Sequence, residues 1–351
     1  MRIAVYAPVL LEQQISNIEQ LVVRTLLYYF YNYTEETFIL LNKEGNNYSG
    51  LTNLVLFNIK EQPKGSIAKR IWWDVKISRA LKKIKPDLFI SFDGQCSLTT
   101  SIPQSLMIID AQRIKARSLV KARSILVGNE PTRKMLVENY GLDNEKIFVV
   151  QPSPDAEFQA IDADVKGKIK DLYSGSKEFF LYHHSGKGKD LIEVLKAFSL
   201  FKKRLGSNLK LLVMTEPGQH VDHGLSNYKY RDDVPLISPE EKKIRAAITA
   251  SAYAVIIPFN TPCDVLVGLN AMQAGAPVIT VKDSDLHEIA GESLLASKTN
   301  AAGDISEKMI QMYIDENLRS AFIEKGKLIA LNFSVEKTAK QMWQAFMKAF
   351  I

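Results

Sequence analysis

Short runs of hydrophobic residues recur along the chain, and polar or Gly/Pro residues end each run. Several runs are apolar at nearly every position, which is typical of strands buried on both faces of a parallel sheet. In the first half they are Ile3–Val9, Phe38–Leu41, Leu54–Ile59, Leu88–Phe92, Leu106–Ile109, Ile125–Val127 and Ile147–Val150. In the second half they are Phe179–Tyr182, Leu209–Met214, Val234–Ile237, Ala254–Ile257 and Pro277–Val281. The pattern predicts strands at these positions.

Segments with helical periodicity lie between many of these runs. Glu12–Tyr33 and Ser66–Ile84 are long and amphipathic. Pro131–Tyr140 begins with Pro and is followed by Gly141, the usual punctuation of a helix. The second half adds Asp190–Leu205, Pro239–Ala250, Val265–Ala274, Ser306–Glu316, Leu318–Leu331 and Val335–Phe350. Strands that alternate with helices predict parallel α/β sheets.

The segment Gln151–Ser176 separates the two halves, because it is rich in Pro, Asp, Ser, Gly and Lys and poor in strand signal. We expect it to be a linker with some helix around Val165–Tyr173. A chain of 351 residues also favours two domains at about 150 residues each. We expect an N-terminal domain at 1–155, a linker region at 156–176, a second domain at 177–335, and a C-terminal helix at 336–351. Two such domains predict a ligand cleft beyond the carboxyl ends of the strands.

Composition narrows the class of protein. The chain is 46% hydrophobic and 24% charged, as is ordinary for a globular protein, which excludes disorder, collagen and coiled coil as the dominant class. The net charge of +6 suits anionic ligands without requiring nucleic acid. With only Cys96 and Cys263, the chain is no disulfide scaffold. The sequence shows no uninterrupted apolar stretch of membrane-spanning length, and its start is typical of a strand rather than a signal peptide. We therefore expect a cytoplasmic protein.

From Ser124 onward the sequence resembles glycosyltransferase family 4. The resemblance is carried by Ser124–Leu136 with Tyr140–Val150, by Phe180–Leu191 with Leu195–Phe198, by Ala252–Phe259 with Leu269–Ile279, and by Phe333–Ala339. It implies a GT-B fold, in which two Rossmann-like domains with parallel sheets face a central cleft and the last helix crosses back to the N-terminal domain. It also implies transfer of a sugar from a nucleotide diphosphate sugar to a saccharide or lipid-linked acceptor, with retention. Assembly of a cell-surface glycan would be a fitting setting.

The same resemblance selects donor-site candidates. Lys189 matches a family lysine, while the family's Gly-Arg pair is replaced by His183-His184. His184, Lys187 and Lys189 would then face a diphosphate, which a loop opening a helix also suits. Asn270 takes the place of the second Glu of the family's Glu-x7-Glu motif and would hold the ribose, with the Asp264 carboxylate nearby. Glu288 lies in a segment similar to one that contacts the donor. No residue is assigned a catalytic role.

A non-catalytic alternative stays open, because neither carboxylate of the Glu-x7-Glu motif is present. Pro262 occupies the position of the first Glu, and Asn270 occupies that of the second. Such a protein would bind a glycan, a nucleotide or a partner enzyme. An epimerase or phosphorylase on the same fold is the third alternative. For the loop at Glu288, a helix start capped by Ser284 or Asp285 is an equally good interpretation. Gly268 either lets a donor approach the helix or belongs to a loop that has lost that function.

Two basic segments in the first half widen the choice of partners. Arg113–Arg123 has five basic residues and no acidic one, and Lys64–Lys85 has eight against Asp74. With Trp72 and Trp73 nearby, these segments would suit peripheral contact with the inner face of a membrane or a phosphorylated acceptor. A solvated helix face is the alternative, and nucleic acid is not expected because no recognition module accompanies the charge. We expect no metal and no cofactor besides the co-substrate, since His220 and His223 have no obvious further ligands.

Overall fold

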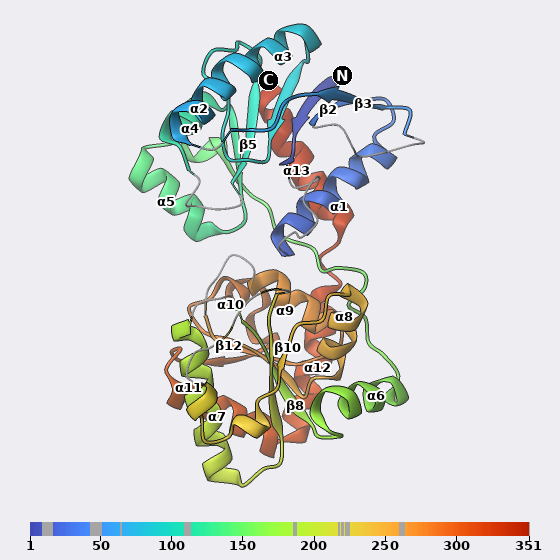
Figure 1. Cartoon of the computed structure of the whole chain (residues 1–351), viewed down its shortest axis with the longest axis vertical. Helices are drawn as coiled ribbons and strands as arrows, with labels where there is room; N and C mark the ends of the chain where they lie inside the picture. Colours follow the sequence, from blue (N-terminus) through green and yellow to red (C-terminus); the bar gives the residue numbers. More distant parts are fainter. Residues whose placement is uncertain are drawn as a thin grey trace. The chain divides into compact units, whose positions relative to one another are not determined.

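The computed structural model describes residues 1–8, 17–42, 51–63, 65–108, 114–184, 188–216, 218, 221, 225–259 and 264–350, and of residues 17–21, 42, 188 and 189 it describes only the backbone. The chain divides into two compact units (Figure 1). Unit 1 comprises Met1–Ser153 and Ser334–Ile351, and unit 2 comprises Pro154–Phe333. None of the described helices is long and apolar enough to cross a membrane.

Unit 1 is built on a parallel sheet of seven strands in the order β3-β2-β1-β4-β5-β6-β7. The strands are β1 (Arg2–Tyr6), β2 (Thr37–Asn42), β3 (Leu54–Asn58), β4 (Leu88–Ser91), β5 (Gln104–Ile108), β6 (Ser124–Val127) and β7 (Ile147–Val149). Every residue of β4, β5 and β6 is buried, as their nearly continuous apolar sequences predict. The helices are α1 (Asn17–Asn32), α2 (Ser66–Ile71), α3 (Ser78–Ile84), α4 (Ala116–Lys121), α5 (Glu130–Tyr140) and α13 (Val335–Phe350).

The C-terminal helix α13 packs in unit 1 beside α1 (Figure 1). The Tyr29 hydroxyl on α1 donates a 2.6 Å hydrogen bond to the backbone oxygen of Ala339. Met342 and Phe346 of α13 are fully buried in the same hydrophobic cluster. Thr338 ties the start of the helix to the end of unit 1 through a hydrogen bond to the Gln151 carbonyl. The last helix therefore completes the core of unit 1, although more than 150 residues of unit 2 separate it from the rest of that unit.

The opposite face of this sheet is covered by a helix with a local irregularity. Trp72–Ile77 form a π-helical turn between α2 and α3. Trp73 is fully buried and Trp72 is 5% exposed, and both rings contact Tyr6 of β1 at centroid distances of 5.3 Å. The sequence hypothesis that these tryptophans help form a membrane-contacting surface is therefore wrong, because both rings belong to the core.

Unit 2 has a parallel sheet of six strands in the order β10-β9-β8-β11-β12-β13. The strands are β8 (Phe179–His183), β9 (Lys210–Met214), β10 (Leu236–Ile237), β11 (Ala254–Ile257), β12 (Val278–Val281) and β13 (Leu295–Ser297). The helices are α6 (Ala163–Ser174), α7 (Gly188–Leu205), α8 (Lys242–Ser251), α9 (Asp264–Gln273), α10 (Asp285–Ala290), α11 (Ala302–Ile314) and α12 (Glu316–Ala330). The segment expected to be a linker thus contains α6, whose Ile169 packs in the same core cluster as Ile248 of α8.

Gly268, in the middle of α9, permits the close approach of α10. A Cβ atom at this position would lie 2.4 and 2.6 Å from the two methyl carbons of Leu286, which is 1% exposed and enclosed by other core residues. Contacts this short require Leu286 or its neighbours to move. The structure therefore gives Gly268 a packing role, and the sequence hypothesis that it opens the helix to a ligand receives no support from its surroundings.

We expect Gly268→Ala to lower the free energy of unfolding by about 1–3 kcal/mol, because overpacking at Leu286 outweighs the gain in helix propensity. Gly167→Ala in α6 is the matched control, since a Cβ there meets nothing within 4 Å. The control should raise the free energy of unfolding by up to about 1 kcal/mol. Denaturant unfolding measures the free energy of unfolding of both variants, which should fall for Gly268→Ala and rise for Gly167→Ala. A Gly268→Ala protein as stable as the wild type would contradict the prediction.

Candidate functional site

The strand order of unit 2 makes the region beside β8 the candidate site. The chain runs from β8 to β9 on one side of the sheet and later returns to pair β11 with the other side of β8. At such a reversal the connections after the two central strands diverge, which leaves a crevice beyond their carboxyl ends. Here those connections lead to the N-termini of α7 and α9, whose backbone N–H groups favour negatively charged or polar groups.

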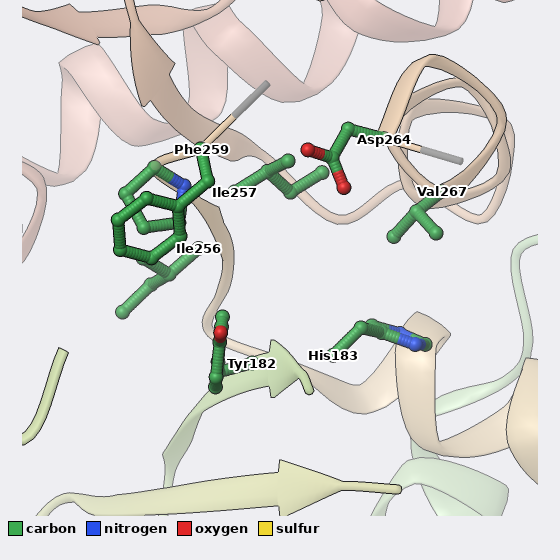
Figure 2. Close-up of a pocket in the computed structure, with 8 residues that line it drawn as sticks. Tyr182, His183, Ile256, Ile257, Phe259, Asp264 and Val267 are labelled. Carbon is green, nitrogen blue, oxygen red and sulfur yellow. The ribbon is translucent and has the colours of Figure 1, made fainter. Parts of the chain in front are cut away.

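A pocket lies at this place (Figure 2). The ends of β8 and β11 and the first turn of α9 supply its walls. The lining residues are Tyr182, His183, Ile256, Ile257, Pro258, Phe259, Asp264 and Val267. Five of them are aliphatic or aromatic hydrocarbons, whereas Tyr182, His183 and Asp264 bring polar groups. Small-molecule sites combine apolar walls with a few polar groups, and this pocket has both.

His183 is the last residue of β8 and lies beneath Val267 in the pocket wall (Figure 2). The residue as a whole is partly buried, but its Nε2 atom is shielded from solvent and has no hydrogen-bond partner among the described residues. Burial, and secondarily the positive charge of Arg245, lowers the pKa of His183 from 6.5 to about 4. The imidazole is therefore neutral at physiological pH and offers a hydrogen bond rather than a charge.

Arg245 on α8 supplies the positive charge next to His183. Its Nε donates to the Pro239 carbonyl at 2.8 Å, and its Nη1 lies 3.0 Å from Oε2 of Glu216. These contacts fix the guanidinium group near the carboxyl ends of β9 and β10. The charge of Arg245 is thus partly compensated by Glu216, while its field still disfavours a proton on His183.

Asp264, a residue selected from the sequence, lines the same pocket at the first position of α9. The positive end of the helix dipole favours a carboxylate there. Burial raises the pKa of the Tyr182 hydroxyl well above its ordinary value, and the negative charges of Asp190 and Asp264 add to this shift. Tyr182 therefore remains a protonated hydrogen-bonding group at any physiological pH.

His184 follows His183 but does not line the pocket described above. It is 4% exposed, its backbone N–H donates to the Met214 carbonyl at 2.8 Å, and its ring lies 6.1 Å from the Tyr182 ring. The backbone bond extends the pairing of β8 with β9. The predicted phosphate contact of His184 stays a prediction. Lys187 and the side chain of Lys189 lie outside the described residues, so their predicted roles also stay predictions.

Asn270 is engaged in a buried contact within unit 2. Its Oδ1 accepts a 2.8 Å hydrogen bond from the backbone N–H of Asp155, and Gln273 donates to the carbonyl of the same residue. The Asp155 carboxylate in turn lies 3.0 Å from Nζ of Lys242. Asp155 and Asn270 are each 5% exposed. The Asn270 Oδ1 atom thus holds the chain where it enters unit 2. The predicted contact of Asn270 with a ribose stays a prediction.

Glu288, the last sequence candidate, is exposed on α10. Its backbone N–H donates to the Ser284 carbonyl, and the Ser284 side chain accepts from the N–H of His287. Ser284 therefore caps the helix, as one of the two sequence interpretations expected. No described interaction brings the Glu288 carboxylate to the pocket, so its donor contact stays a prediction.

The sequence selection missed His183, Tyr182 and Phe259 as pocket residues. A sharper signal was available, because residues at the carboxyl end of a central parallel strand are the ones that face a ligand. No group of three metal-ligating side chains occurs in the described part of the chain. The His220 and His223 pair lies outside it.

Comparisons with known proteins bear on unit 2 and on the fold of the whole chain. Residues 162–328, most of unit 2, match the family model of glycosyl transferases group 1. A comparison with curated proteins finds no match. The match of unit 2 to the glycosyl transferases group 1 model supports glycosyl transfer in general.

Solved structures resemble the whole chain. The glycosyltransferase from Rickettsia africae is 13% identical with a TM-score of 0.75, covering 99% of this chain and 98% of that one. WaaG, a glycosyltransferase involved in lipopolysaccharide biosynthesis, is 12% identical with a TM-score of 0.71, covering 97% and 98%. Anabaena HepE, solved with UDP and glucose, is 12% identical with a TM-score of 0.70, covering 98% of each chain. At these identities the likeness shows the fold, which is GT-B with two Rossmann-like domains, as the sequence predicts.

The low pKa of His183 predicts a pH dependence of stability. The unfolded chain takes up a proton as the pH falls through about 6.5, whereas the folded protein takes it up only near pH 4. Stability is therefore lost as the pH falls between these values, by at most about 1.4 kcal/mol per pH unit. Thermal unfolding at about pH 7 and about pH 4.5 should show a smaller drop in Tm for His183→Asn than for the wild type.

The same substitution at the partly exposed His287 controls for loss of an imidazole elsewhere in unit 2. Equal drops in Tm for the wild type and for His183→Asn would contradict the assignment of a buried neutral His183.

Proposed function

We propose that the chain is a glycosyltransferase that moves a sugar from a nucleotide diphosphate sugar to a saccharide or lipid-linked acceptor, with retention of configuration. The observation that carries the proposal is the pocket at the strand-order reversal of unit 2, inside the segment that matches the glycosyl transferases group 1 model. The UDP and glucose in the Anabaena structure support a nucleotide sugar as the first ligand to test. Assembly of a cell-surface glycan is the proposed setting, which the involvement of WaaG in lipopolysaccharide biosynthesis supports.

In this proposal the donor lies across the starts of α7 and α9. Lys189, with Lys187, offsets the charge that develops on the leaving diphosphate, and helix N-terminal N–H groups assist them. His184 contributes an imidazole where the family has arginine, which makes it the weaker clamp. Asp264 faces the glycosyl group from the first turn of α9, while Asn270 and Glu288 are the proposed contacts to the ribose and the donor. No cofactor is required.

Binding of a nucleotide sugar is the first test. Purified protein is screened by thermal shift and calorimetry against UDP-, GDP- and ADP-sugars and the free nucleotides. A ligand at 100 times its dissociation constant should add about 2.7 kcal/mol of stability, which such a screen detects readily. Lys189→Ala should weaken the binding by about tenfold, the effect of losing one charged hydrogen-bond donor. A well-folded protein that binds none of these compounds would overturn the proposal.

A non-catalytic GT-B protein is the second candidate, favoured by Asn270 and Pro262 in place of the two motif carboxylates. The hydrogen bond from Asp155 to Asn270 adds to this case, because it gives Asn270 a structural use. Turnover distinguishes the two candidates. An enzyme releases nucleotide diphosphate from the bound donor in the presence of acceptor, whereas a binding protein retains intact donor or binds none.

We also propose that a basic surface of unit 1 contacts an anionic membrane, and we retain the cytoplasmic address that the sequence predicts. Arg117 and Lys121 are exposed on α4 beside Val120, which is 70% exposed. On α3, Arg79, Lys82 and Lys83 are exposed as well. The buried Trp72 and Trp73 take no part, so the attraction rests on charge and on a few small apolar side chains. Each cation near an anionic bilayer is worth about 1 kcal/mol.

Co-sedimentation with vesicles tests this surface. Binding to phosphatidylglycerol vesicles should exceed binding to phosphatidylcholine vesicles and decline with added salt. The double variant Arg117→Glu/Lys121→Glu should bind the anionic vesicles about tenfold or more weakly. The matched control reverses two exposed cations of unit 2, Lys203→Glu/Arg204→Glu, and should bind as the wild type does. Equal effects of the two double variants would show that only net charge matters and would contradict the proposed surface.

A further inference from the structure

Strand β3 is the least protected of the sheet edges that the structure describes. It is the outermost strand of the unit 1 sheet and has β2 as its neighbour (Figure 1). The other edge strands, β7, β10 and β13, have only three, two and three residues. Natural sheets keep their edges short or place charges, proline or bulges on them, because an open edge pairs with other chains. By contrast, β3 (Leu54–Asn58) has five residues, no charge, no proline and an unbroken register with β2.

The side chains of β3 leave both faces of the sheet open at this edge. Val55 is 49% exposed and Leu56 is 45% exposed. Because successive side chains of a strand point to opposite faces, each face carries one of these large apolar residues. Addition of another strand would pair the edge and cover both side chains at the same time. The pattern therefore indicates a docking edge rather than a solvated one.

The register with β2 determines which backbone groups of β3 point outward. The Phe38 N–H donates to the Asn53 carbonyl at 2.8 Å, which places the backbone groups of Asn53 on the β2 side. The side on which backbone groups lie alternates along a strand, so those of Val55 also face β2. The N–H and C=O groups of Leu54 and Leu56 consequently point away from β2, where a further strand can pair with them.

The sequence of β3 is complementary to itself when two copies run antiparallel about a two-fold axis at Leu56. Leu56 then forms the central hydrogen-bonded pair with its own copy, because its backbone groups point outward. Val55 lies opposite Phe57 of the second copy, in a pair whose side chains approach closely. An aromatic and a β-branched side chain stabilise each other across strands. Both exposed side chains thus gain an apolar neighbour, and no charges of the two strands face each other.

We propose that a second copy of this chain docks on β3, so that the unit 1 sheets of the two copies join edge to edge. The interface is isologous, because the same strand supplies both sides. A second copy brings the required apolar alternation in the register that the outward backbone groups allow. The inference goes beyond the proposed sugar transfer and does not depend on it, because the candidate site lies in unit 2.

Analytical ultracentrifugation of the full chain tests the proposal. At about 100 μM, above the micromolar Kd of a weak interface, the wild type should sediment with twice the chain mass of 39.5 kDa. Leu56→Lys places like charges opposite each other at the two-fold axis and should raise the dimer Kd about tenfold or more. Leu172→Lys is the matched control and should leave the Kd unchanged, because Leu172 is 76% exposed on α6 of unit 2. Thermal unfolding verifies that each variant is folded.

Two further variants at the same position test the register and the strand pairing. Leu56→Glu alone should weaken the dimer as Leu56→Lys does, whereas an equimolar mixture of the two should dimerise, because opposite charges then face each other. Leu56→Pro leaves the pairing with β2 intact, since the Leu56 N–H points away from β2. The two-fold axis duplicates the loss, so both hydrogen bonds of the central pair disappear and the Kd should rise about tenfold.

Three outcomes would overturn the proposal. A wild type that stays monomeric at about 100 μM would exclude a second copy and favour a strand from a different protein. A dimer that none of the Leu56 variants weakens must form through another surface. A dimer that Leu56→Lys weakens and Leu56→Pro does not would be held by side-chain contact without strand pairing.

Discussion

The reversal of strand order at β8 is the constraint on which the candidate site depends. Parallel strands require crossover connections. After β8 and β11 these connections run in opposite directions, which leaves a crevice beyond the carboxyl ends of the two strands. The sheet itself is held by burial of nearly continuous apolar strands, such as β11, in which every residue is buried. With a consecutive strand order the connections after β8 and β11 would not diverge, and no crevice would open beyond these two strands. The chemistry of the site is therefore set by a few side chains added to a geometry that the core already imposes.

The same helix α9 serves the site at one end and the architecture at the other. Its first residue, Asp264, lines the pocket, whereas Asn270 and Gln273 hold the backbone of Asp155. Gly268 lies between them and allows Leu286 to pack directly against the helix. Because a buried N–H must be paired, replacing the motif carboxylate by asparagine at position 270 still leaves an acceptor for Asp155. Asn270 therefore has a structural role within unit 2.

Much of the fold follows from local pattern. Leu88–Phe92 and Ala254–Ile257 were predictable strands because both of their faces are buried in parallel sheets. Strand β13 was not predicted, since Leu295–Ser297 is short and includes only one large apolar residue. Ser66–Ile84 was predicted as one helix, but a π-helical turn interrupts it and directs Trp72 and Trp73 into the core. A turn of that kind is fixed by tertiary contacts such as the packing on Tyr6, which periodicity does not record.

The site was harder to predict because its decisive features are matters of environment. A basic loop sequence and a family pattern pointed to His184, yet His183 is the histidine that lines the described pocket. What distinguishes the two is position, because His183 is the last residue of β8 and lines the pocket, whereas His184 follows the strand and does not. Burial and the charge of Arg245, 62 residues further along the chain, keep His183 neutral. A neutral imidazole offers a hydrogen bond and no positive charge, so His183 does not by itself mark an anion site. The protonation state of His183 is thus set by its surroundings in the folded protein, which the sequence pattern does not record.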